Sequence, residues 1–572
     1  MNLLILFSLL KYYIYVYNVF INSTYMNTRR QTNTVKIGNI KIGSNEPIMI
    51  QSMLNTSTMD TDASVAQSIR IIKNGGELVR ITAQGVKEAN NLKNISDKLH
   101  ALGYNVPLSA DIHFVPQAAI VSAKYVDKVR INPGNFVDLR ATFKHYLYSE
   151  EQYTDELKRQ KAKIIEFLEV CKKYNTAVRI GTNHGSLSDR IMSRYGDTPE
   201  GMVEATMEYL RVCKSENFEN VVISLKSSDC KVMADAVRLL VLAMDEENIH
   251  YPLHLGVTEA GEGVEARIKS AIGIGMLLNE GIGDTIRVSL TEAPENEIPV
   301  AADLVKICTP SYNKDVINKL LDKNDENIKR YTHPKIYPAL KTIVSVKDYI
   351  SKRKHSDFVE IKSMDEINSS FIDLIKEDKD AILVLSPTLN YHNYLKILLK
   401  MEESRIYNKP LIKVVWNASS CIDADLQISA HIGGLFIDRL AYGLYIETPN
   451  IEDKNFPILL SQNILQASGL IRFKTEFISC PGCGRTLYNL QKAVADVKRE
   501  FSHLSKLKIA IMGCVVNGPG EMGDADYGYV GAGNGKVNLY KGKTIARKAI
   551  PEDKAVEELK NLIVESGDWV EV

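Results

Sequence analysis

The chain has 572 residues, 45% of them hydrophobic and 24% charged, and its 70 basic residues balance 70 acidic ones. These fractions are typical of a globular protein, and the length allows about two or three domains. A net charge of zero gives no support to a nucleic-acid or membrane partner. Eight cysteines in this length do not make a disulfide scaffold, so a reducing compartment is the simplest expectation.

Residues 1–28 differ from the rest of the chain. Leu3–Leu10 is apolar and a tyrosine-rich run follows it, as in a signal peptide. A signal peptide, however, also has a basic region before the apolar run and a small-residue cleavage site after it, and neither is present. A second methionine, Met26, stands just before the globular pattern begins. We therefore predict an N-terminal extension or a misassigned start, and a cytoplasmic protein. A plastid-type organelle is the alternative if the extension is a targeting sequence.

Residues 29–310 contain eight short apolar segments separated by stretches of helix length. Strands that alternate with helices predict a parallel sheet, and eight such units in about 250 residues predict a closed (β/α)8 TIM barrel. A doubly wound open sheet is the alternative, but it gives no reason for eight units. The segments are Pro47–Met53, Leu78–Ala83, Pro107–His113, Lys128–Gly134, Thr176–Asn183, Val221–Ser228, Pro252–Glu259 and Asp284–Glu292.

Polar residues occupy one face of these segments and aliphatic residues the other. Barrel strands bury aliphatic side chains against the outer helices, so the polar face points into the barrel. Five basic residues then point inward: Arg80, Arg130, Arg179, Lys226 and Arg287.

Inward charges cost free energy unless something pairs with them. The same segments offer Asp111 and Glu259 as carboxylate partners. Two carboxylates do not neutralise five cations, which predicts an anionic ligand of high charge density, such as a diphosphate. The alternative is that some of these cations form salt bridges that fill the barrel.

Other polar residues lie where the segments end. Asp111 and His113 close the third segment, Asn183 and His184 the fifth, and Glu259 the seventh. Barrel enzymes place their chemistry at the carboxyl ends of the strands. Two histidines on one rim beside a carboxylate therefore favour a catalytic site over isolated structural histidines.

Residues 311–455 interrupt the regular alternation of strand-like and helix-length segments. The stretch 311–329 is polar and rich in Lys and Asn, and Ala381–Leu385, Leu411–Asn417 and Gly433–Glu447 have the pattern of α/β elements. No group of acid, base or ligand residues occurs in them, and we interpret Cys421 and His431 as incidental. We predict an inserted α/β spacer domain here and a C-terminal α+β domain over residues 456–572.

The C-terminal region holds a cysteine module. Cys480 and Cys483 are three residues apart, an amphipathic helix is predicted over 487–501, and a strand over 507–513 ends at Cys514. Three thiolates leave a four-iron cluster one ligand short, and Glu521 is the nearest candidate for the fourth position. A structural zinc with His503 as the fourth ligand is the alternative, and a CxxC redox pair is disfavoured. The glycine-rich run Tyr527–Gly535 predicts a hairpin, because no Lys-Ser/Thr follows it as in a phosphate loop.

From Arg29 onward the sequence resembles the 4-hydroxy-3-methylbut-2-enyl diphosphate synthase family, iron–sulfur enzymes of the methylerythritol phosphate route to isoprenoids. The resemblance is carried by five motifs: Ala110–Phe114, Arg130–Asn135, His254–Gly261, Ser479–Arg485 and Gly513–Glu521. The family has a two-domain form and a longer form with an insert between barrel and cluster domain, and this chain resembles the longer form.

The resemblance implies a 4Fe-4S cluster held by Cys480, Cys483, Cys514 and Glu521. It implies that the barrel binds 2-C-methyl-D-erythritol 2,4-cyclodiphosphate and opens its ring with two electrons from ferredoxin or flavodoxin, with loss of water. The residues that match the substrate site are Arg80, Arg130, Arg179, Lys226 and Ser289, to which we add Asn183. Glu259 is the candidate proton donor, with His113 and Asp111 positioning it or the substrate, and Glu521 is also counted as catalytic.

We expect a monomer or homodimer with no nucleic-acid or membrane partner. In two-domain relatives the cluster domain of one chain covers the barrel of the other, whereas a folded spacer allows one chain to complete its own site. Two other functions stay open on the residues alone. One is a lyase or aldolase for a phosphorylated sugar, with Lys226 as a Schiff-base nucleophile and a zinc-held dimerisation module. The other is a redox-sensing binding protein without turnover.

Overall fold

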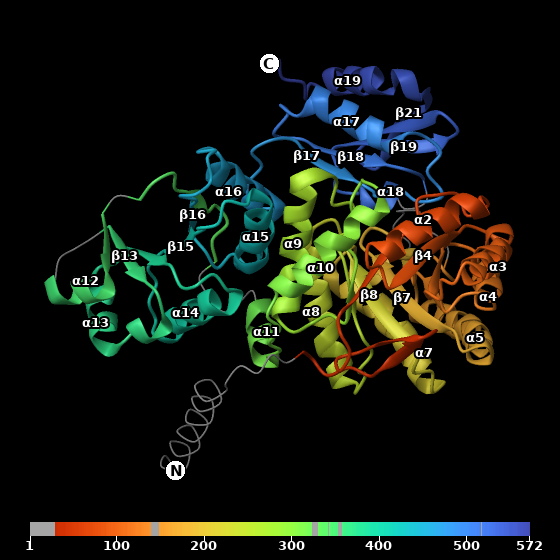
Figure 1. Cartoon of the computed structure of the whole chain (residues 1–572), viewed down its shortest axis with the longest axis horizontal. Coiled ribbons are helices and arrows are strands. Elements are labelled where there is room, and N and C mark those ends of the chain that lie inside the picture. Colours follow the sequence, from red (N-terminus) through yellow and green to blue (C-terminus); the bar gives the residue numbers. More distant parts are fainter. Residues whose placement is uncertain are drawn as a thin grey trace, which may run out of the picture.

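The computed structural model describes residues 29–138, 148–322, 330–340, 342–352, 357–515 and 518–571. These residues form a barrel, a second sheet at one side of the barrel, and a C-terminal domain above one end of it (Figure 1). The predicted N-terminal extension lies outside the described residues.

The barrel is a closed ring of eight parallel strands. The hydrogen-bonded order is β8-β7-β6-β5-β4-β3-β10-β9, and a bridge between Ile223 and Leu253 joins the two ends. Each strand lies within one of the eight predicted segments, so the predicted TIM barrel is confirmed. The strands are β3 (Met49–Met53), β4 (Leu78–Ala83), β5 (Leu108–Ile112), β6 (Lys128–Ile131), β7 (Ala177–Asn183), β8 (Val221–Lys226), β9 (His254–Leu255) and β10 (Thr285–Ile286).

Helices surround this ring and bury its aliphatic face, in which Val79, Ile81 and Val129 are fully or almost fully buried. Local sequence sets where several helices begin: the Asp60 side chain caps α2, and Ser149 and Gln152 form a capping box at α5. The barrel helices are α2 (Thr61–Lys73), α3 (Val86–Ala101), α4 (Pro116–Ser122), α5 (Glu150–Tyr174), α6 (Asp189–Tyr195), α7 (Pro199–Ser215), α8 (Cys230–Glu246), α9 (Gly263–Asn279) and α10 (Glu297–Ile307).

A small antiparallel hairpin closes the amino end of the barrel. It consists of β1 (Val35–Ile37) and β2 (Ile40–Ile42). Its buried aliphatic side chains form one cluster with Met49 and Leu78, the first residues of β3 and β4. The carboxyl ends of the strands are therefore the end of the barrel left for a ligand.

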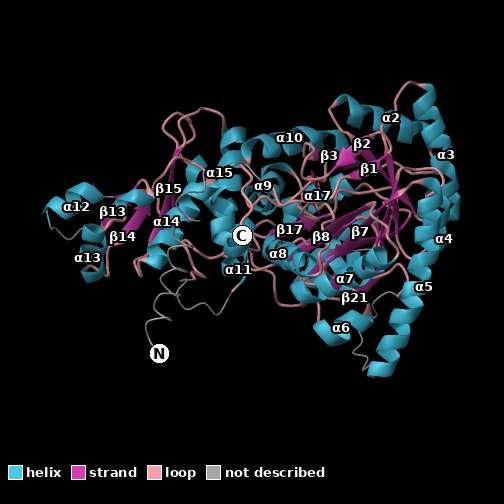
Figure 2. Ribbon diagram, turned by 90° about the horizontal axis from the view of Figure 1, so that it is seen from below, coloured by secondary structure: helices cyan, strands magenta, loops and turns pink. Residues whose placement is uncertain are grey.

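The second sheet has six parallel strands in the order β11-β16-β15-β14-β13-β12 and lies to one side of the barrel (Figure 2). This confirms an inserted α/β fold, although Gly433–Glu447 is not one element, because Gly433 belongs to α15 and β16 begins at Gly443. The strands are β11 (Lys335–Ile336), β12 (Ile343–Ser345), β13 (Phe358–Ile361), β14 (Ile382–Leu385), β15 (Pro410–Val415) and β16 (Gly443–Glu447). The helices are α11 (Lys314–Leu321), α12 (Val346–Lys352), α13 (Ser369–Glu377), α14 (Tyr391–Glu403), α15 (Cys421–Ile437) and α16 (Phe456–Ala467).

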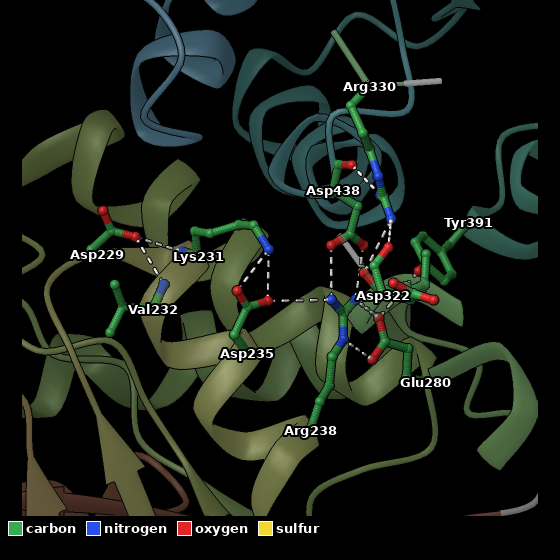
Figure 3. A network of polar contacts seen from close by, with 11 residues as sticks. Asp229, Lys231, Val232, Asp235, Arg238, Glu280, Asp322, Arg330, Tyr391 and Asp438 are labelled. Carbon is green, nitrogen blue, oxygen red and sulfur yellow. Dashed lines mark hydrogen bonds and ion pairs between the residues drawn. The ribbon is translucent and has the colours of Figure 1, made fainter. Parts of the chain in front are cut away.

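Helix α15 packs directly on helix α9 of the barrel. A Cβ added to Gly433 would lie 2.4 Å from Ile272, and one added to Gly275 would lie 3.0 Å from Ala430, so small residues let the two helices approach closely. Beside this contact the buried Arg238 of α8 bonds Asp438, which follows α15, at 2.8 Å, and it also pairs with Glu280 (Figure 3). The spacer is therefore attached to the barrel by close apolar packing and a buried ionic network.

The C-terminal domain is a five-stranded mixed sheet with helices on it. Its elements are β17 (Glu476–Ser479), β18 (Lys508–Met512), β19 (Tyr527–Gly533), β20 (Lys536–Lys541), β21 (Thr544–Pro551), α17 (Leu490–Phe501), α18 (Gly518–Glu521) and α19 (Ala555–Glu565). The predicted glycine-rich hairpin is confirmed as the antiparallel pair β19 and β20. The predicted helix begins later than expected, because Leu487 precedes α17 and is 55% exposed.

Candidate active site

A cavity of about 90 Å³ lies where the mouth of the barrel meets the C-terminal domain. The barrel and the C-terminal domain of the same chain both line it. Its predicted site residues are Arg80, Arg130, Arg179, Asn183, Lys226, Glu259, Ser289, Cys480, Cys483, Cys514 and Glu521. Asp111 and His113 do not line the cavity, but both contact Arg130.

Two of the inward cations share one carboxylate. Arg80 and Arg130 approach Asp111 Oδ1 at 2.9 and 3.0 Å, and Asp111 is fully buried. Burial acts to raise the pKa of Asp111, but the two arginines outweigh it and hold that pKa well below its ordinary value. Asp111 is therefore a fixed anion that orients two guanidinium groups toward the cavity.

The remaining inward cations divide into paired and unpaired groups. Arg287 forms an ion pair with Glu297 at 2.9 Å. Arg179 donates to Ser224 Oγ at 2.5 Å, and no carboxylate lies within ion-pair distance of Arg179 or Lys226 in the described part of the chain. Burial lowers the pKa of Lys226 well below its ordinary value, and Arg179 lowers it further. Arg179 and Lys226 therefore lack a balancing carboxylate among the described residues, and a bound anion would favour their charged forms.

Three residues of this region were missing from the sequence prediction. Lys128 lies two residues before Arg130 on the same face of β6 and is fully buried with no hydrogen-bond partner at Nζ, so strand alternation could have identified it. Glu297, the partner of Arg287, lies on a helix beyond the last strand. Arg485 approaches Asp111 Oδ2 at 3.4 Å and lies next to the CxxC motif. No local pattern in the sequence indicated the last two contacts.

His113 is held as a neutral side chain. Burial lowers its pKa to about 3, although Asp111 acts in the opposite direction. Arg130 Nη1 donates to His113 Nε2 at 2.6 Å. A neutral imidazole that accepts a bond from Arg130 can position that arginine, but it is not an imidazolium general acid near neutral pH.

The three cysteines converge because β17 and β18 are parallel neighbours that end at the same edge. Cys480 follows β17, Cys514 follows β18, and the backbone N–H of Gly513 donates to Cys480 Sγ at 3.1 Å. The turn through Gly482 has φ of +78°, which suits glycine and returns Cys483 to the cavity. Val516 and Asn517 of the predicted turn lie outside the described residues.

The thiols of this group have shifted acidities. A hydrogen bond from Cys514 lowers the pKa of Cys483 well below its ordinary value, and Arg485 contributes in the same direction. Burial raises the pKa of Cys480 to about 12. One thiolate is thus favoured even without a metal, which fits a soft-metal donor set.

Glu521 and Glu259 are neighbours in the lining of the cavity. Asn183 of β7 donates to Glu521 Oε1, which links the barrel to the C-terminal domain. The backbone of Glu259 has φ of +50°. Burial of the Glu259 carboxyl group, together with the neighbouring Glu521, raises its pKa well above the ordinary value. A buried carboxyl group that keeps its proton is chemically able to donate it.

The zinc set with His503 is not assembled. His503 lies against the Trp569 ring, with 5.0 Å between ring centroids, and its Nε2 is 2.9 Å from the Val570 carbonyl oxygen. Among the described residues, no three His, Cys, Asp or Glu side chains are grouped to hold a single metal ion.

Close contacts fix the C-terminal domain on the barrel. Thr291 and Ser479 are hydrogen-bonded at 2.8 Å, and Ala260 pairs with Ser479 in a parallel bridge. A Cβ on Gly185 would lie 2.1 Å from the Gly520 carbonyl oxygen, so a larger residue would separate the domains there.

Two family profiles match the chain: the GcpE TIM-barrel domain over residues 32–302 and the GcpE protein C-terminal domain over residues 476–565. The chain belongs to the GcpE family. The GcpE profiles leave residues 303–475 unmatched, and these contain the second sheet.

Curated GcpE relatives are similar along nearly the whole chain. Proteins called 4-hydroxy-3-methylbut-2-en-1-yl diphosphate synthase (flavodoxin) are 43% identical in Phocaeicola vulgatus and 44% identical in Parabacteroides distasonis. Each alignment covers 92% of this chain and 96% of the relative. Among solved structures, dihydropteroate synthase from Burkholderia cenocepacia has 14% identity and a TM-score of 0.33, over 49% of this chain and 96% of that one. That likeness is too slight to support a functional argument.

No helix in the described ranges is both long and apolar enough to cross a membrane.

Proposed function

We infer that this chain is a 4-hydroxy-3-methylbut-2-en-1-yl diphosphate synthase of isoprenoid biosynthesis. The observation that carries this function is one cavity in which unbalanced arginine and lysine side chains face three cysteines and a glutamate. We propose that its substrate is 2-C-methyl-D-erythritol 2,4-cyclodiphosphate. Two electrons enter, the ring bond from carbon to phosphate oxygen breaks, and one hydroxyl group leaves as water.

The donor set supports a 4Fe-4S cluster as the resident cofactor. Cys480, Cys483, Cys514 and Glu521 line one cavity, and the Cys483 thiolate is favoured by its neighbours. These four residues would hold the cluster, with the glutamate oxygen as the most exchangeable ligand. The cluster supplies single electrons and a Lewis-acidic iron when bound.

The barrel residues have separate roles in this proposal. Arg80, Arg130, Arg179 and Lys226 bind the diphosphate, whose charge balances theirs. Ser289 lines the same cavity and adds a hydroxyl group. Asp111 fixes Arg80 and Arg130, and His113 positions Arg130.

Residues at the rim of the barrel orient the carboxylate ligand Glu521 and supply the proton for the reaction. Asn183 orients Glu521 through its hydrogen bond, and Glu259 holds a proton at its carboxyl group. We assign Glu259 as the proton donor for the departing hydroxyl group, with Glu521 as the second catalytic carboxylate.

The electron donor is proposed to be flavodoxin, because the relatives' names specify it; ferredoxin is the alternative. The division into a barrel over residues 29–310, a spacer over 311–455 and a cluster domain over 456–572 is also a proposal, which we change at one boundary: α16 packs against α15 and β16, so we assign it to the spacer. A cytoplasmic location is proposed on the bacterial origin of the relatives.

The test is conversion of the cyclodiphosphate by anaerobically reconstituted protein with reduced flavodoxin. We expect the hydroxylated butenyl diphosphate as product and none from Glu521→Gln, in which the acidic ligand is replaced by a similarly shaped amide. Iron content and product are measured together. An iron-loaded wild-type protein that leaves the cyclodiphosphate unchanged would refute the proposed reaction.

A further inference from the structure

A second and larger cavity lies on the other side of the loop that carries Glu259. Its volume is about 280 Å³. Glu259 lines the mouth cavity, whereas the next two residues, Ala260 and Gly261, line this one. The second cavity is therefore separate from the candidate active site and adjoins it through one loop.

All three parts of the fold contribute walls to this cavity. The barrel supplies the start of α8 and the first turns of α9, the spacer supplies α16, and the C-terminal domain supplies parts of β17, α17 and β18. We call it the junction cavity. A ligand bound in it would contact elements of all three parts at once.

Most carboxylates of the junction cavity are already bound to cations. Glu265 pairs with Lys474, and Glu262 pairs with Lys498 at 3.5 Å. Lys508 binds both Glu476, at 3.2 Å, and Asp524, at 2.5 Å.

The remaining carboxylate, Asp229, is used by the backbone. It accepts bonds from the N–H groups of Lys231 and Val232 at 2.7 and 3.0 Å and so caps α8 (Figure 3). The acidic side chains of this cavity are thus committed to the protein.

One cation of the cavity has no such partner. Lys269 of α9 is only 8% exposed, lines the cavity, and has no carboxylate within ion-pair distance among the residues described. Burial of an unpaired ammonium group costs free energy that a bound anion would recover. The geometry therefore offers a positive charge for a ligand.

Neutral hydrogen-bond donors accompany this charge. The side chains of Ser228 and Asn463 line the cavity and make no hydrogen bond in the described part of the chain. Gln466 Oε1 accepts the N–H of Phe473 at 3.0 Å, so its amide NH₂ group stays available. Available donors beside committed acceptors favour an oxygen-rich anion over a cation or an apolar ligand.

We propose that the junction cavity is a second ligand site, where Lys269 binds a small oxyanion, either a carboxylate or a phosphate. The ligand bridges the barrel, the spacer and the C-terminal domain. This site is distinct from the diphosphate site of the proposed reaction, and binding there stabilises the domain arrangement that encloses the mouth cavity.

The experiment titrates inorganic phosphate, and separately malonate, into the full-length cluster-loaded protein by calorimetry. Saturating cyclodiphosphate without reductant occupies the arginines of the mouth, so that only the junction cavity remains. We expect saturable binding of at least one probe, and the probe that binds identifies the oxyanion class. Lys269→Met should weaken this binding at least tenfold, Lys269→Arg should retain it, and Lys306→Met, at an exposed lysine of α10, should leave it unchanged.

Three outcomes overturn the proposal. One is no binding of either probe once the cyclodiphosphate is present, which would leave a merely hydrated junction. Another is binding that Lys269→Met does not weaken. The third is equal weakening by Lys306→Met, which would show a general charge effect. Failure of the cyclodiphosphate itself to bind would count against the proposed reaction instead, so the two failures are distinguishable.

Discussion

Arg238 and Arg179 are buried arginines of the same barrel, but their surroundings are opposite. Arg238 lies on the flank that faces the spacer, where Glu280 and Asp438 both bind it. Arg179 lies in the mouth, where its hydrogen-bond partner is the uncharged Ser224. The protein balances charge where two of its parts must stay together, and it leaves charge unbalanced where an anionic ligand is expected to bind.

The largest effect on activity should come from replacing a cysteine that lines the mouth cavity. Cys514→Ser should remove most of the iron and reduce turnover by orders of magnitude, because serine is a poor soft-metal ligand. Cys421→Ser, at a half-buried cysteine outside the cavity, should leave both unchanged. Iron analysis and turnover are measured on the same preparations. Full iron and activity in Cys514→Ser would refute the assigned ligand.

Removing the Arg238 cation from the flank should make the protein unfold more easily. Arg238→Met leaves the buried carboxylates Glu280 and Asp438 without the cation that binds them, which should lower stability by about 3–5 kcal/mol. Arg211→Met, which breaks an exposed pair with Glu247, should change stability by less than about 1 kcal/mol. Thermal and denaturant unfolding provide the measurement. Equal stabilities for the two variants would show that the buried network does not hold the spacer.

Replacing an arginine of the mouth by methionine should not lower the stability of the protein, in contrast to Arg238→Met. Arg179→Met should weaken cyclodiphosphate binding by about 2–5 kcal/mol. It should leave the ligand-free protein as stable or more stable, since an unpaired buried charge is removed. Calorimetric binding and thermal unfolding are compared. If stability fell as far as in Arg238→Met, the contrast between flank and mouth would be wrong.

A smaller effect is expected below the mouth, at Lys128. Burial and the charge of Arg179 lower its pKa well below its ordinary value, so the folded protein binds fewer protons there than the unfolded chain. Stability therefore falls as pH decreases from about 10 toward the lowered pKa. Lys128→Met should remove this loss and stabilise the protein by on the order of 1–4 kcal/mol near pH 7.

The gain from Lys128→Met should shrink as pH approaches the ordinary lysine range. Lys124→Met provides the matched control, because Lys124 is exposed four residues earlier. Chemical unfolding at several pH values is the measurement. A gain that grew with rising pH would contradict a lowered pKa.

The difference between local and distant contacts explains how much the sequence could predict. Alternation of side chains along a strand is a local pattern, so the five inward cations and the closed barrel were predictable. The same alternation could also have identified Lys128. The Arg238–Asp438 pair joins helix surfaces 200 positions apart, for which the sequence carries no pattern. Arg485 was missed for a related reason: its contact with Asp111 spans 374 positions and depends on how the domains dock.

The cysteine motif was predictable as a donor set, because its spacing and its turn are local. The position of Leu487 was not predicted correctly, since apolar spacing alone does not show where a helix begins. Asn489 caps α17 by accepting the N–H of Lys492, and this cap sets the start of the helix after Leu487.

The mouth cavity is completed by residues from both ends of one polypeptide, and this determines how activity scales with concentration. A site shared between two chains loses half of its groups whenever the chains separate, so its specific activity falls on dilution. A site completed within one chain depends only on an intramolecular closure. We therefore expect the specific activity of this protein to stay constant on dilution, and we expect a damaged copy to leave an intact neighbour active.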